Sequence, residues 1–284
     1  MSLALRVIPR LDIKGSNLVK GVHLEGLRVL GKPESFAKFY YEQGADEIFY
    51  QDVVASLYGR NSLHDIISKT AKEVFIPLTV GGGIRTIEDI SRLLYAGADK
   101  VAINTAVISN PELITSASNR YGASTVVVSI EAIRQADGNY LAFTDNGRNA
   151  TGKEVVAWAK EVEELGAGEI LLTGVDYEGS GEGFGLDLIE QVINAVSIPV
   201  VAHGGAGKMQ HVLDLTGKLP VSGVAIASLF HYDYISHERH IDGYDGGNVE
   251  FLKSNRVLSN IDCVSIPRLK SFLMKNNVLC RNNE

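Results

Sequence analysis

The chain has 284 residues, of which 45% are hydrophobic and 21% are charged, a composition typical of a globular protein with a large core. Its net charge of −7 comes without a cluster of basic residues, which argues against nucleic acid or an anionic membrane as its main partner. Its two cysteines predict neither a disulfide framework nor a metal site, and no apolar run approaches the length of a membrane span. We therefore expect a cytoplasmic enzyme.

Short apolar segments rich in Val and Ile alternate with amphipathic ones along the chain. Eight of the apolar segments are predicted as β-strands, at residues 6–13, 47–54, 76–82, 100–106, 125–132, 169–175, 198–205 and 223–228. The amphipathic segments, such as 33–44, 86–97 and 153–166, are predicted as helices, and each of these three ends at a glycine. Alternating strands and helices form right-handed βαβ units and a parallel sheet.

The two halves of the chain repeat each other. IPLTVGGGI begins at Ile76 and IPVVAHGGAG at Ile198, an offset of 122 residues, and VAIN at 101–104 recurs as VAIA at 224–227. A weaker match pairs LDI at 11–13 with IEA 119 residues later. Eight βα units with a half-chain repeat favour one (β/α)8 TIM barrel over residues 1–284, with a doubly wound open sheet as the alternative.

The repeated glycine runs suggest anion sites. GGGI (81–84) and HGGAG (203–207) are each predicted to end a strand and open a helix, where backbone N–H groups can bind an anion. The alternative for each run is a tight turn that needs positive φ. Two runs at equivalent positions, with Asn104, Thr105 and Ser228 at the following strand ends, favour two phosphate sites on opposite sides of the barrel mouth. The substrate would then carry a phosphate at each end.

Carboxylates are placed for acid–base chemistry at the same edge. Asp12 and Glu131 are predicted to end the first and fifth strands, so they would face each other across the mouth. Asp52 and Glu178 lie near the ends of the second and sixth strands. The alternative is that any of the four is a solvated loop acid or a helix cap.

Four charged residues mark the opposite ends of the strands. Arg6, Glu47, Lys100 and Glu169 each begin a predicted strand, with a parity that could point them into the barrel floor. Two cations and two anions there could neutralise one another. The alternative is that these strand starts are solvated and the charges cost little.

Six segments together resemble the cyclase subunit family of imidazole glycerol phosphate synthase: RVIPRLDIKGSNLVKG, ADEIFYQDVVAS, IPLTVGGGI, GADKVAINTA, VEELGAGEILLTG and VAHGGAGKM. The resemblance covers about residues 5–232 and the final helix. It implies a barrel enzyme of histidine biosynthesis that needs no cofactor and no metal ion. Such an enzyme takes ammonia from a glutaminase partner. It converts a phosphoribulosyl formimino aminoimidazole carboxamide nucleotide, with a phosphate at each end, into imidazole glycerol phosphate and aminoimidazole carboxamide ribotide.

The resemblance also implies roles for individual residues. Asp12 and Glu131 would be the catalytic acids. The floor residues Arg6, Glu47, Lys100 and Glu169 would form a gate for ammonia, on the face where the glutaminase docks. The substrate and its phosphates would be bound by Lys20, Asp52, Gly82, Gly83, Asn104, Thr105, Thr173, Glu178, Gly179, His203, Gly204, Gly205, Ala227 and Ser228.

The sequence departs from the family where substrate would bind. Glu131 and Glu178 replace Asp, whereas His203 and Asn146 stand where Ser is expected. An insertion at about 236–262, between the eighth strand and the last helix, is predicted to flank the mouth like a lid. These changes leave open a relative that channels ammonia to an N-acetyl-sugar amidotransferase in surface-polysaccharide synthesis. The related isomerase of histidine biosynthesis needs no ammonia, so the intact floor residues argue against it.

Overall fold

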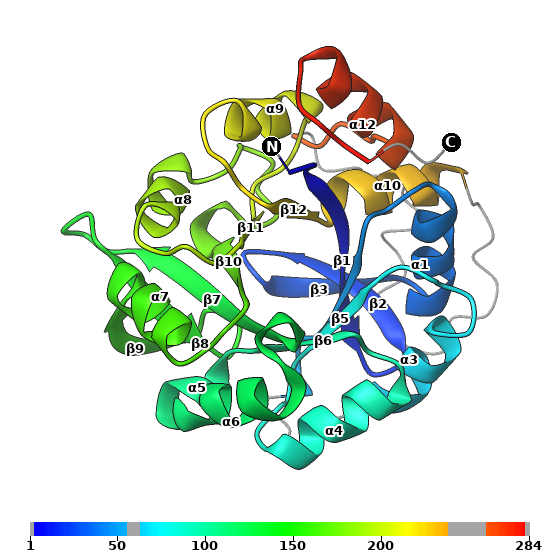
Figure 1. The fold of residues 1–284 in the computed structure, drawn as a ribbon. Coiled ribbons are helices and arrows are strands. Elements are labelled where there is room, and N and C mark those ends of the chain that lie inside the picture. The colour runs from blue at the N-terminus through cyan, green and yellow to red at the C-terminus, as the bar shows by residue number, and fades with distance from the viewer. Residues whose placement is uncertain (1–2, 56–62, 238–259, 282–284) are drawn as a thin grey trace.

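Eight parallel strands form a closed barrel in a computed structural model, which describes residues 3–55, 63–237 and 260–281 (Figure 1). In barrel order they are β1 (Arg6–Lys14), β4 (Ile48–Asp52), β5 (Leu78–Gly81), β6 (Lys100–Ile103), β7 (Val126–Arg134), β10 (Glu169–Gly174), β11 (Val200–His203) and β12 (Gly223–Ile226). The barrel closes where β12 pairs with β1, with Arg6 opposite Gly223. All eight predicted strands and the (β/α)8 barrel are confirmed, and the open sheet is excluded.

Helices surround the strands on the outside of the barrel (Figure 1). They are α1 (Pro33–Glu42), α3 (His64–Thr70), α4 (Ile87–Ala96), α5 (Thr105–Ser109), α6 (Glu112–Tyr121), α7 (Val155–Glu164), α8 (Leu186–Ile193), α9 (Met209–Thr216), α10 (Ser228–His237) and α12 (Ile266–Lys275). Helix α4 begins at a capping box between Thr86 and Asp89, and its C-cap Gly97 has φ 118°. None of the described helices is long and apolar enough to cross a membrane.

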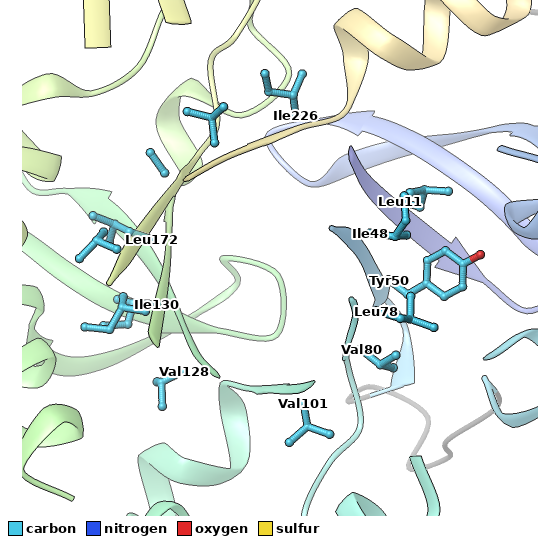
Figure 2. Close-up of a cluster of buried hydrophobic side chains, with 14 of the residues drawn as sticks. Leu11, Ile48, Tyr50, Leu78, Val80, Val101, Val128, Ile130, Leu172 and Ile226 are labelled. Atoms are coloured by element: carbon cyan, nitrogen blue, oxygen red, sulfur yellow. The ribbon is translucent and has the colours of Figure 1, made fainter. Parts of the chain in front are cut away.

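The strand alternation divides the apolar side chains into two layers. Outward-facing residues such as Leu11, Tyr50, Val128 and Leu172 belong to the large cluster of buried side chains, part of which is drawn in Figure 2. A smaller cluster fills the barrel interior: Ile8, Phe49, Ala102, Val127, Leu171, Val201 and Ala225. Because successive residues of a strand point to opposite sides, the interior cluster fixes which polar residues above and below it also face inward.

Two antiparallel hairpins extend the barrel wall in segments where the sequence predicts no strand or helix. β2 (Asn17–Val22) and β3 (Glu25–Gly31) continue from β1, whereas β8 (Tyr140–Thr144) and β9 (Asn149–Glu154) continue from β7. These hairpins follow the first strand of each half, which agrees with the half-barrel repeat. Asp12 pairs with Val19 and Glu131 with Phe143, so the two acids lie inside extended strands, and the prediction that they end their strands is wrong.

Only the edges of the predicted insertion are described. Helix α10 runs to His237, and residues 238–259, which carry most of the predicted lid, lie outside the described residues. At the returning edge, Ile261 is buried and the Asp262 N–H donates to the carbonyl of Gly207 at 2.8 Å. The insertion therefore returns beside the second glycine run, on the face that bears the strand C-termini.

Candidate active site

A cavity of about 290 Å³ opens at the C-terminal ends of the strands. Seven residues predicted for the substrate site line it: Asp52, Gly82, Gly83, Asn104, Thr105, Glu131 and Thr173. Other polar residues on its wall are Arg10, Gln51, Arg85, Ser109, Asn110, Ser129, Asp145 and Asn146. The cavity thus joins the first glycine run to one of the two predicted catalytic acids.

The two glycine runs have equivalent backbone geometry. Gly82 has φ 102° and Gly204 has φ 100°, both in the left-handed region. A Cβ at Gly82 would collide with the Asp52 carbonyl, and one at Gly204 would collide with the Gly174 carbonyl. Gly204 lies 122 residues after Gly82, and Gly174 lies 122 residues after Asp52. The positions therefore require glycine because each run passes close under the end of the preceding strand.

The glycine runs do not open helices directly, contrary to the prediction. Helix α4 begins at Ile87, after Arg85 and Thr86, and α9 begins at Met209, so Gly82, Gly83, Gly204 and Gly205 all lie outside the helices and only Gly207 adjoins the α9 N-cap, Lys208. Instead, the following strands lead straight into helices, α5 at Thr105 and α10 at Ser228. Each anion site would therefore combine a glycine run with the start of the helix that follows the next strand.

Glu131 is a buried acid on the cavity wall. It is 8% exposed and accepts a hydrogen bond from the Gly147 N–H at 2.8 Å. Burial raises its pKa to about 7, against the opposing effects of this hydrogen bond, of the Arg10 charge and of a hydrogen bond with Asn104. A carboxyl group with a pKa near neutrality can both donate and accept a proton at physiological pH.

Asp12 forms an ion pair with a buried arginine and does not face the cavity. The Arg10 Nε donates to Asp12 Oδ1 at 2.9 Å, and both side chains are 4% exposed. Arg10 Nη1 also lies 3.1 Å from His203 Nδ1 and 3.4 Å from Thr173 Oγ1. Burial, together with the charges of Arg10 and Lys20, lowers the pKa of His203 well below its ordinary value. The neutral imidazole can then accept a hydrogen bond from the guanidinium at Nδ1.

Lys20 and Glu178 join the first hairpin to the loop after β10. Their side chains form a buried ion pair, and the Leu24 N–H donates to Glu178 Oε2 at 2.9 Å. Gly179 has φ 71°, and a Cβ there would lie 2.9 Å from the Gly21 carbonyl oxygen. This contact fixes the hairpin across one side of the mouth. In Figure 1, β3 is visible behind the centre of the barrel.

The second glycine run lies at the ends of β11 and β12. His203 pairs with Ala225 between these strands, and Gly205 accepts a hydrogen bond from the Gly183 N–H at 2.8 Å. Ala227 and Ser228 follow at the end of β12, and both are buried. The His203 side chain turns inward to Arg10, so the second run offers backbone N–H groups rather than an imidazolium to an anion.

The four predicted floor residues meet in a ring of ion pairs. Lys100 Nζ lies 3.0 Å from both Glu47 and Glu169, and Arg6 pairs with the same two carboxylates. Thr79 donates a further hydrogen bond to Glu47. Burial alone would raise the pKa of Glu169, but Arg6 and Lys100 lower it. The charges neutralise one another as predicted, at the strand N-termini.

Comparisons with known proteins agree with this geometry. Residues 6–236 match the family model of the histidine biosynthesis proteins. Subunit HisF of imidazole glycerol phosphate synthase from Legionella pneumophila is 59% identical over 206 residues, which cover 72% of this chain and 97% of that protein. The HisF subunits of Streptococcus mutans and Streptococcus sanguinis are 44% and 42% identical over 234 residues, covering 82% of this chain and 93% of each relative. The chain belongs to the HisF family.

HisF membership confirms the resemblance that the six motifs predict. The sugar-amidation alternative gains no support from these relatives, whose names all denote imidazole glycerol phosphate synthase. The family match ends at residue 236, so the predicted insertion follows the matched region.

Sequence reasoning missed several residues of this HisF site. Arg10 stands two positions before Asp12 and shares its inward parity, a signal that could have identified it. Ser129 likewise stands two positions before Glu131 and shares its inward parity. Asn146 is noted from the sequence as a departure from the family near the substrate, but Asp145 was missed, because it sits in the β8–β9 turn of a hairpin that the sequence pattern does not predict. Asn146 donates to the carbonyl of Val53, which ties this turn to the end of β4.

Proposed function

We propose that this HisF chain is the ammonia-dependent cyclase of imidazole glycerol phosphate synthase in the histidine pathway, acting in the cytoplasm. Its substrate is the bisphosphorylated phosphoribulosyl formimino aminoimidazole carboxamide nucleotide. The observation that carries the proposal is the pair of equivalent glycine-bordered strand ends at one mouth of the barrel. A substrate with a phosphate at each end matches two anion sites related by the half-barrel repeat.

Each phosphate site combines a glycine run with the start of a helix. Gly82, Gly83, Asn104 and Thr105 supply the first site, and they line the cavity. Gly204, Gly205, Ala227 and Ser228 supply the second. Helix N-termini and glycine backbones bind anions without a lysine or arginine, because unpaired N–H groups point at the ligand. Lys20, held by Glu178, adds a cation beside the mouth.

The acids act on the centre of the bound substrate. Glu131 titrates near neutrality and faces the cavity, so it serves as the proton donor and acceptor. Asp12 lies across the barrel and acts with its partner Arg10. This arrangement supports acid–base chemistry on a substrate that is fixed at both ends.

Ammonia enters through the opposite end of the barrel. The ring of Arg6, Glu47, Lys100 and Glu169 borders the interior at the strand N-termini, below the apolar layer. We assign this ring as the gate and place the glutaminase on the face that bears it. The apolar layer above the ring would keep ammonia from being protonated on its way to the cavity.

Turnover with ammonia alone tests the assignment. The purified chain, given the nucleotide substrate and excess ammonium salt at pH 8.5, should form imidazole glycerol phosphate without a glutaminase. Glu131→Gln and Asp12→Asn should each reduce kcat by about 100-fold or more, the usual size of a general acid–base contribution. Glu164→Gln, which changes an exposed glutamate on α7, serves as the matched control. A wild-type chain that leaves the substrate unchanged would refute the cyclase assignment.

A further inference from the structure

Arg10 is a buried cation on the wall of the proposed active site. Its side chain is 4% exposed, yet it lines the cavity, whereas its partner Asp12 is not among the lining residues. A buried guanidinium is costly to desolvate, so its place beside a substrate cavity calls for an explanation. The residue at the equivalent position of the second half is Ser129, 119 residues later, so the half-barrel repeat does not require an arginine here.

Three strands fix the direction of the guanidinium. Asp12 on β1 accepts from its Nε, and Thr173 on β10 and His203 on β11 contact its Nη1. Arg10 Cζ also stands 5.6 Å from the centre of the Phe49 ring, which belongs to the apolar layer inside the barrel. The cation is therefore held where the barrel interior opens into the cavity. Such a group is preorganised and needs no rearrangement when charge develops beside it.

We propose that Arg10 is a catalytic residue that binds the ketone oxygen of the substrate and stabilises the negative charge formed there when ammonia adds. Asp12, Thr173 and His203 are positioning residues that hold the guanidinium in place. This inference rests on the proposed cyclase function and deepens it. It also accounts for Asp12, which reaches the substrate through Arg10.

The step is balanced without any further reactant. The nitrogen of ammonia forms a bond to the ketone carbon, and the π electron pair of the carbonyl moves to oxygen, beside the guanidinium. Protonated Glu131 gives its proton to that oxygen. The resulting carboxylate then takes a proton from the new ammonium nitrogen, which leaves a neutral carbinolamine and restores protonated Glu131. Ammonia that enters through the floor ring would pass Phe49 and emerge next to Arg10.

The charge environment of Glu131 gives a second readout. Arg10 on β1 lowers its pKa, whereas Asp145 in the β8–β9 turn raises it, and Asn104 and the Gly147 N–H lower it by hydrogen bonding. Removal of the Arg10 charge should therefore move the titration of Glu131 to higher pH. A residue that only packed against Asp12 would not shift this titration.

The test compares Arg10→Met, Arg10→Gln and Arg10→Lys in ammonium-dependent turnover, with no glutaminase present. Arg10→Met should lower kcat by about 100- to 1,000-fold, as loss of one oxyanion donor does, with a smaller change in KM. Arg10→Lys should recover part of this loss, whereas Arg10→Gln, which keeps a hydrogen-bond donor but no charge, should not. Arg120→Met removes an exposed arginine on α6 and should leave kcat unchanged.

The pH profile of kcat completes the experiment. The limb that reports Glu131 should move to higher pH in Arg10→Met and Arg10→Gln, but not in Arg10→Lys. If Arg10→Met does not fold, Arg10→Gln gives the same comparison with a donor left for Asp12. An active wild type whose kcat and pH profile are unchanged in Arg10→Gln would overturn the role of Arg10 and leave the cyclase function intact. A wild type that cannot turn over the substrate would remove both.

Discussion

The buried carboxyl group of Glu131 should make the stability of the barrel depend on pH. Its pKa is raised from an ordinary value of 4.5 to about 7, chiefly by burial. The folded state therefore holds the proton more tightly than the unfolded state does. The contribution of Glu131 to the free energy of unfolding is fully present below pH 4.5 and is lost as pH rises through 7. At 1.36 kcal/mol per pKa unit, the free energy of unfolding should fall by roughly 3 kcal/mol from this group.

Glu131→Gln isolates that contribution, because glutamine keeps the shape of the side chain and cannot ionise. The free energy of unfolding of this variant, minus that of the wild type, should increase by about 3 kcal/mol between pH 4 and pH 8. Urea unfolding followed by circular dichroism at several pH values measures this difference. Glu164→Gln provides the exposed control. A difference for Glu131→Gln that stays constant over this pH range would refute the argument that burial controls this acid.

Other predictions concern the floor ring and the glycine runs. Lys100→Met removes one of the two cations that pair with Glu47 and Glu169; glutamine-dependent turnover with the glutaminase should fall relative to ammonium-dependent turnover. An unchanged ratio would contradict a gating role. Gly204→Ala should lower the free energy of unfolding by at least about 1 kcal/mol more than Gly138→Ala, because both glycines have left-handed φ but only Gly204 has a carbonyl in the way of a Cβ. Equal losses in urea unfolding would show that the close approach is unimportant. Gly204→Ala should also weaken competitive inhibition by inorganic phosphate, and an unchanged inhibition constant would remove this run from the phosphate site.

The periodic features of the fold could be predicted from the sequence. The strands of a barrel are short apolar segments between amphipathic helices, and the 122-residue repeat limits how these units can be arranged. Inward parity also placed Arg6, Glu47, Lys100 and Glu169 together, because residues at equivalent levels of neighbouring strands face one interior. Such predictions rely on patterns that repeat in each βα unit.

The hairpins after β1 and β7 could not be predicted from such repeating patterns. Their strands include sequences such as NATGKE, which is largely polar, is exposed or only partly buried, and carries no alternation of apolar residues. They form because β1 and β7 continue beyond the barrel and provide edges for pairing. The missed hairpins hid the contribution of the β8–β9 turn to the cavity. They also made the first and fifth strands look shorter, so that Asp12 and Glu131 appeared to lie at the strand ends.

The substitutions that break the half-barrel repeat decide where the cavity lies. Arg10 is matched by Ser129 in the other half, and His203 is matched by Gly81. Arg10 and His203 fill the interior on one side, where they contact each other, whereas the Ser129 hydroxyl has no hydrogen-bond partner among the described residues. The cavity is accordingly lined by Ser129 and by the glycines that follow Gly81. Asp12 and Glu131, which occupy equivalent positions in the two halves, therefore have different environments. Asp12 faces a fixed cation and Glu131 faces open space, so a symmetric scaffold supports two distinct chemical roles.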